Sequence, residues 1–178
     1  MACITKLASA IAYDCDSGAT GLVSALIINK ADIESYTVNE SGGVSVLTLA
    51  SGAKAYKIDT VKRSTTISTS LKINEGAPNA YAHTVNLTVM DALISRTYTS
   101  LSAALSNGSF VVLARHTGGF PAAYGLYYGL SATSAERSSH DNGGWTTYTL
   151  ETPENVIGED NLFVGTNVYD ALYAAAIG

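Results

Sequence analysis

The alternation of apolar and polar residues along several Thr- and Ser-rich segments constrains the fold of this chain more than any other feature. A period of two places one face of a strand against a core and the other toward solvent. Segments 44–50 and 53–61 alternate on either side of a Ser-Gly pair, which predicts a long hairpin. Segments 64–73 and 81–90 alternate in the same way. The first half of the chain therefore predicts antiparallel β-structure.

Other segments predict strands that are buried or bent. Residues 22–29 and 109–116 are nearly continuous apolar runs of strand length. Residues 122–132 predict one strand, bent where two glycines interrupt it, and residues 145–151 predict the second strand of a hairpin with it.

One segment changes to helical periodicity. Apolar residues recur at helical spacing over 92–106, Asp91 is a suitable N-cap, and Asn107-Gly108 predicts a left-handed end. Residues 168–178 predict a short C-terminal helix or an arm. The sum is a single domain over 1–178 in the α+β class, a β-rich sandwich or barrel with one flanking helix.

The composition indicates a surface with few charges. Charged residues make up 14% of the chain, while Ser and Thr number 19 each. Such a surface suits a subunit that is covered by copies of itself. The net charge is -5, and residues 138–178 hold six acids and no Lys or Arg. No basic stripe is present in the sequence, so specific binding to nucleic-acid phosphates is not expected.

The candidate catalytic and metal-binding residues lack the spacing that such chemistry needs. Ser139, His140 and Asp141 are consecutive, whereas a catalytic triad brings together distant segments, so we interpret them as turn residues. His83 and His116 have no ligand partners at metal-binding spacing and are expected at the surface or in hydrogen bonds.

Cysteine and acidic residues give no stronger indication of chemistry. Cys3 and Cys15 are expected to be free thiols. The acids at 151, 154, 159 and 160 are expected on a solvated face rather than in a hydrolase cleft. The sequence predicts no enzyme, no cofactor, no metal and no membrane anchor.

Two stretches resemble a known family. CITKLASAIAYDCDSGATGLVSALIIN at 3–29, and GLYYGLSATS with DNGGWTTYTLETPE over 125–154, resemble the tail tube (major tail) proteins of tailed phages that infect Bacteroidetes-type bacteria. The resemblance implies a β-sandwich or barrel with a flanking helix, assembled into hexameric rings that stack as a tube. It implies a location in the virion tail, with assembly in the host cytoplasm.

The same resemblance implies which partners the chain has. These are other copies of the chain, other tail or head-tail proteins, and passing DNA that is not specifically bound. Lumens in this family are typically negative, and no strand here is strongly acidic. The alternatives are a capsid decoration or head-tail joining protein, and a carbohydrate-binding adhesin module.

Two sets of residues are candidates for contacts between subunits. The aromatic residues of the hairpin region are expected in subunit contacts: Tyr124, Tyr127, Tyr128, Trp145 and Tyr148. A basic segment is expected to meet an acidic segment of the adjacent ring: Lys54, Lys57, Lys62 and Arg63 against Glu151, Glu154, Glu159 and Asp160.

Overall fold

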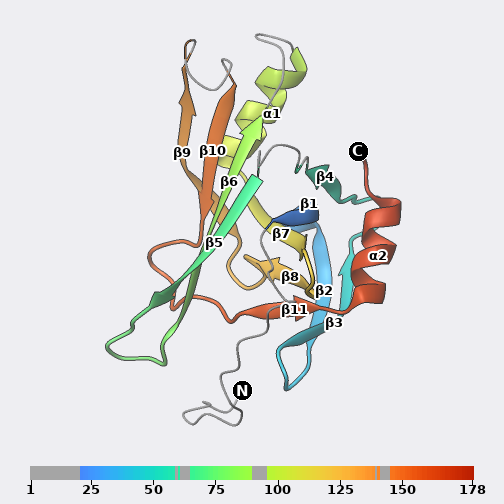
Figure 1. Cartoon of the computed structure of the whole chain (residues 1–178), viewed down its shortest axis with the longest axis vertical. Helices are drawn as coiled ribbons and strands as arrows, with labels where there is room; N and C mark the ends of the chain where they lie inside the picture. The colour runs from blue at the N-terminus through green and yellow to red at the C-terminus, as the bar shows by residue number, and fades with distance from the viewer. Residues whose placement is uncertain (1–20, 59, 61–64, 90–95, 139, 141–144) are drawn as a thin grey trace.

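The fold is β-rich and belongs to the predicted α+β class (Figure 1). The computed structural model describes residues 21–58, 60, 65–89, 96–138, 140 and 145–178. The strands are β1 (Leu22–Asn29), β2 (Ile33–Val38), β3 (Gly43–Leu49), β4 (Tyr56–Ile58), β5 (Thr65–Lys72), β6 (Ala80–Val89), β7 (Ser109–His116), β8 (Pro121–Tyr124), β9 (Leu130–Arg137), β10 (Thr146–Glu151) and β11 (Leu162–Val164). The helices are η1, a single 3-10 turn (Lys30–Asp32), α1 (Arg96–Asn107) and α2 (Thr166–Ala175).

The centre of the molecule is the antiparallel pair β1–β7, which is apolar on both faces. Leu26 and Leu113 face one core cluster together with β3, β8, β11 and α2. Ala25 and Val112 face a second cluster together with β6, β10 and α1. The nearly continuous apolar runs of these two strands follow from this burial on both sides.

Beyond β7 the sheet divides into two wings. The N-terminal end of β7 pairs with β9 through Ser109 and Phe110, whereas residues 112–115 pair with β8. One wing continues as β8–β11–β3–β2 and the other as β9–β10–β6–β5. The division lies at the turn 125–129 between β8 and β9 (Figure 1). We call β5–β6–β10–β9 the four-stranded wing.

The two helices cover opposite parts of the sheet. Helix α1 packs on the four-stranded wing and buries Leu105 in the second core cluster. Helix α2 packs on the first cluster through Tyr169. Both helices confirm segments predicted from the sequence, although residues 92–95 lie outside the described part of the chain. Gly108 is not left-handed as predicted. It is required because a Cβ there would collide with the Phe110 ring and the Ala104 carbonyl.

Two strand predictions are wrong. Segments 44–50 and 53–61 do not pair with each other, because β3 pairs with β2 and β11 while β4 crosses to β1. Burial of Ala55 in the core and the hydrogen bond from the Lys57 N–H to the Ile177 carbonyl hold β4 in that position. The predicted single strand 122–132 is interrupted at Gly125, whose φ of 79° is left-handed. The long hairpins of the structure are β5–β6 and β9–β10.

Candidate functional site

The solvent face of the four-stranded wing consists of short polar side chains. Because strand residues alternate between faces, the register of β5, β6, β10 and β9 places one set of residues together on the side away from the core. This polar face comprises Thr66, Ser68, Ser70, Lys72, Ala82, Thr84, Asn86, Thr88, Ser134, Glu136, Thr147, Thr149 and Glu151. The opposite side of the same strands forms the core under α1.

Hydrogen bonds cross the polar face from strand to strand. The Asn86 amide donates from Nδ2 to Thr66 Oγ1 at 3.3 Å and accepts at Oδ1 from Thr149 Oγ1 at 2.9 Å. Asn86 thereby links β5, β6 and β10. Thr84 Oγ1 donates to Glu151 Oε1 at 3.3 Å. Most of the polar groups on this face are neutral. Groups that hydrogen-bond one another have fewer donors and acceptors left for a ligand than unpaired groups would have.

The charge of the polar face is weakly acidic. By register its charged members are Glu136, Glu151 and, at the far end of β5, Lys72. The Lys72 ammonium group donates to the carbonyls of Glu154 and Val156 at 2.7 and 2.6 Å, so it is held at that end of the face. The face therefore offers little attraction to phosphate groups.

Both long edges of the four-stranded wing are open among the described strands. Residues 66–71 of β5 pair with β6 on one side and with no described strand on the other. The first two residues of β9 pair with β7. Over 132–136, β9 pairs with β10 and with no other described strand. Residues 66–71 contain no Pro and no charge, and Lys72 at the end of the strand is its one charged residue, so the middle of β5 lacks the Pro and charged side chains that normally protect an edge strand. By contrast, β2 at the other end of the sheet has two register shifts and carries Glu34.

Glu159 is wrongly predicted as a solvated contact residue. It is 1% exposed, and its Oε1 accepts the backbone N–H groups of Tyr127 at 3.1 Å and Tyr128 at 2.8 Å. The turn 125–129 points these N–H groups at the carboxylate because Gly125 and Gly129 are both left-handed. Burial raises the pKa of Glu159, although the hydrogen bonds from the turn oppose that shift. The backbone of Glu159 also pairs with Tyr81, so this residue ties the turn to β6 where the wings divide.

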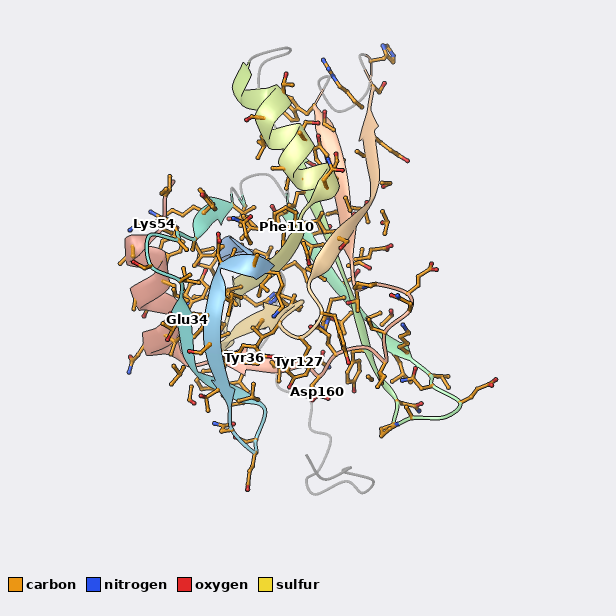
Figure 2. All side chains as sticks on the ribbon, turned by 180° about the vertical axis from the view of Figure 1, so that it is seen from behind. Glu34, Tyr36, Lys54, Phe110, Tyr127 and Asp160 are labelled. Carbon is orange, nitrogen blue, oxygen red and sulfur yellow. The ribbon has the colours of Figure 1, made fainter. Side chains whose placement is uncertain are left out.

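A lysine supports the same turn from the other side. Lys30 Nζ donates to the Leu126 carbonyl at 2.7 Å and lies 5.3 Å from the centre of the Tyr36 ring. Burial lowers the pKa of Lys30, and the charge of Glu159 opposes that change. Tyr36 and Tyr127 also lie close together, with ring centres 6.3 Å apart (Figure 2). The arrangement is a structural clamp on the turn.

Two histidines lie beside Tyr124, His83 in the core and His116 half-buried. His83 is fully buried, and its Nδ1 lies 3.0 Å from Thr69 Oγ1. His116 Nε2 lies 2.6 Å from the Tyr124 hydroxyl. Burial lowers the pKa of both histidines and raises that of Tyr124 to about 12. Tyr124 is therefore a core residue, and its prediction as a subunit contact is wrong.

The remaining predicted aromatic contacts separate into core and surface. Tyr148 is 1% exposed, and its hydroxyl donates to Ser102 Oγ of α1 at 2.7 Å, so it is not a contact residue either. Tyr128 and Trp145 are exposed, and Tyr127 is half-buried. These three stay predictions as subunit contacts.

The predicted charged contacts are only partly at the surface. Lys54, Lys57 and Glu154 are exposed, while Glu151 and Asp160 are half-buried. Lys62 and Arg63 lie outside the described residues, as do Ser139, Asp141, Cys3 and Cys15. His140 is exposed.

An apolar cavity lies between α1, the sheet and β4, at the end of the wing where β5 begins. Its volume is about 480 Å³, roughly three times the ~150 Å³ of an apolar cavity that takes up benzene. Its walls include Ile27, Ile58, Leu87, Leu101, Ala104 and Phe110. Leu101 and Ala104 are exposed, so the cavity opens on the surface beside α1. The sequence predicts the helical stripe but not the cavity, because it predicts that 53–61 pairs with 44–50 whereas β4 pairs with β1.

Comparisons of the chain with protein-family models, with curated proteins and with solved structures find no match. Within the described ranges, no helix is long and apolar enough to cross a membrane. The same ranges contain no group of three His, Cys, Asp or Glu residues placed to hold a metal ion. Function is therefore inferred from the surfaces of the chain itself.

Proposed function

We propose that the chain is a structural virion subunit, a phage tail tube protein whose copies join side by side into rings that stack as a DNA-conducting tube. The observation that carries this proposal is the four-stranded wing with two open edges. An unprotected edge strand is a template for pairing with another chain, and stable monomers normally protect such edges. A wing that is open on both sides has room for a neighbour at each edge.

The strand directions suit a ring of identical copies. Consecutive strands across β5–β6–β10–β9 are antiparallel, so β5 and β9 run in opposite directions. When two copies stand in the same orientation, β9 of one therefore meets β5 of the next as an antiparallel pair. Such head-to-tail contacts generate a ring when the rotation between copies closes. The resemblance of the sequence implies six copies.

The polar face suits the inner wall of such a tube. Side-by-side joining of the wings would form one continuous sheet, with α1 on one side and the polar face on the other. Hydroxyl and amide groups that already bond one another, with two acids (Glu136 and Glu151) against one lysine (Lys72), would let DNA pass without holding its phosphates. A weakly acidic face also agrees with the negative lumen that the resemblance implies.

The adhesin alternative loses part of its support. A carbohydrate site needs exposed aromatic platforms, and two of the five aromatic residues of the hairpin region, Tyr124 and Tyr148, are in the core. A capsid decoration or head-tail joining protein would also be structural, but it would not polymerise into a tube.

Electron microscopy of the purified full chain tests this proposal. We expect rings and, at higher protein concentration, hollow tubes. Rings that never stack would favour a joining or decoration protein. A chain that remains a monomer over the micromolar range in sedimentation would overturn the proposal.

A further inference from the structure

The apolar cavity beside α1 is part of the second core cluster. Its apolar walls come from residues that belong to this cluster or pack against it: Ile27, Ile58, Leu87, Val89, Leu105 and Phe110. These residues lie on β1, β4, β6, β7 and α1, so five elements of the fold hold the walls in place. A site built on strands and a helix is already formed before a ligand arrives, which lowers the entropy cost of binding.

The cavity offers no charged group to a ligand among its described lining residues. Lys57 is the one charged residue that lines it. The Lys57 ammonium group lies 4.9 Å from the centre of the Tyr173 ring of α2, so only the rest of this residue is left to face the cavity. An ion that entered would lose its hydration without gaining a partner. The cavity therefore suits a neutral ligand.

Two of the polar side chains that line the cavity are engaged elsewhere. Asn29 Nδ2 donates to Asp32 Oδ2 at 2.7 Å. Thr88 Oγ1 lies 3.3 Å from Thr147 Oγ1, on the polar face of the wing. These groups leave few directed hydrogen bonds for a ligand, so the affinity must come from apolar contact.

The volume and one aromatic wall set the size and shape of the ligand. The volume of about 480 Å³ is within the range of ordinary ligand pockets and holds up to about three benzene-sized rings. The Phe110 ring lies against Gly108 at the end of α1, beside the cavity (Figure 2). A flat ring gains an offset or edge-on contact with such a wall. The exposed Leu101 and Ala104 mark the opening through which a ligand enters.

We propose that the apolar cavity binds a neutral, flat aromatic molecule of two or three rings. The described residues that line the site all belong to one copy of the chain. The inference therefore goes beyond the proposed function and does not depend on assembly.

Two fluorescent probes with the same ring skeleton test the size and the charge of the ligand. N-phenyl-1-naphthylamine is neutral and has three aromatic rings, whereas 8-anilinonaphthalene-1-sulfonate adds one negative charge. Titration of the full chain into each probe, followed by the probe's fluorescence, measures the affinity. We expect saturable binding of the amine at one site per chain. The sulfonate should bind at least about tenfold more weakly, because its charge finds no partner in the cavity.

Two tryptophan variants locate the bound probe. Ala103 and Ala104 are both exposed on α1, but only Ala104 lines the cavity. Ala104→Trp should weaken binding of the amine by about tenfold or more, because the indole occupies the opening, and the smaller Ala104→Phe should weaken it less. Ala103→Trp is the matched control and should bind within about twofold of wild type. The amine should raise the melting temperature of wild type and Ala103→Trp but not of Ala104→Trp, which also checks that each variant is folded.

Four results would overturn the inference while leaving the proposed function standing. These are no saturable binding of the amine by wild type, equal affinities of the two tryptophan variants, and sulfonate binding as tight as amine binding that Ala104→Trp removes. The fourth is the release of monomers from assembled protein by the amine in sedimentation, because the cavity would then be a contact between copies. Absence of rings from the wild type would instead contradict the proposed function and leave the probe titrations unaffected.

Discussion

Removal of the Glu159 carboxylate should destabilise the fold where its two wings divide. Glu159→Ala leaves the partly buried N–H groups of Tyr127 and Tyr128 without their acceptor. An unsatisfied buried donor costs about 1–3 kcal/mol. The loss is partly offset because the variant no longer buries a carboxylate whose Oε2 has no hydrogen-bond partner among the described residues. We expect a net loss of about 2–4 kcal/mol in the free energy of unfolding, and a melting temperature lower by roughly 5–15 °C.

Glu159→Gln is the matched control, because the amide oxygen still accepts both N–H groups. It should lie within about 1 kcal/mol of wild type at neutral pH. Burial raises the pKa of Glu159 in the folded state, so the folded chain holds that proton to higher pH than the unfolded chain does. The wild type should therefore lose stability relative to Glu159→Gln as the pH rises from the ordinary value of 4.5 through the raised pKa.

Urea unfolding of all three proteins between pH 4 and pH 8, at a concentration too low for assembly, measures both effects. Equal stability of Glu159→Ala and Glu159→Gln would refute the clamp. A pH dependence of the wild type that matches Glu159→Gln would refute the titration of this carboxyl group.

Three further perturbations have defined outcomes. Gly129→Ala should cost about 1–3 kcal/mol more than Gly52→Ala in urea unfolding, because both glycines are left-handed but only Gly129 is crowded by a neighbouring side chain; equal costs would contradict this. Tyr148→Phe should cost about 0.5–1.5 kcal/mol through its lost hydrogen bond to α1, and an unchanged unfolding midpoint would show that the bond contributes nothing. Glu136→Lys with Glu151→Lys makes the polar face basic and should give assembled protein a salt-dependent affinity for DNA in a filter-binding assay; no gain in DNA binding would argue against this face as the lumen.

The sequence predicts those strands whose own pattern of apolar residues reflects their burial, on one face or on both. β1 and β7 could be located because both of their faces are apolar, and β10 because its burial alternates residue by residue. The pairing of β4 could not be predicted, because Ser51-Gly52 suits a hairpin equally well and the contact with Ile177 is distant in sequence. Long-range pairing leaves no local signal.

The candidate site was predicted only in part. Glu159 and Tyr124 have polar groups that usually lie at the surface. The burial of Glu159 depends on the distant turn that binds it, and Tyr124 packs against His83 of β6. Glu159 is bound by a turn more than thirty residues earlier. The polar face could have been found from the Thr and Ser alternation in β5, β6 and β10, but only once their order in the sheet is known.

Disulfide trapping across the two open edges tests the central claim most directly. Ser68 of β5 and Ser134 of β9 lie on the outer strands of the four-stranded wing, roughly 14 Å apart, too far for a bond within one chain. In a chain whose own two cysteines are replaced by Ser, Ser68→Cys with Ser134→Cys should give, on oxidation, a ladder of linked subunits on a non-reducing gel that ends at the ring number. Cysteine pairs at neighbouring positions of the two strands test whether the register between copies is shifted. Each variant with a single cysteine is a control and should give at most dimers. A ladder from any pair agrees with edge-to-edge rings, whereas oxidised protein that stays monomeric at every pair, while electron microscopy shows rings, would contradict the account.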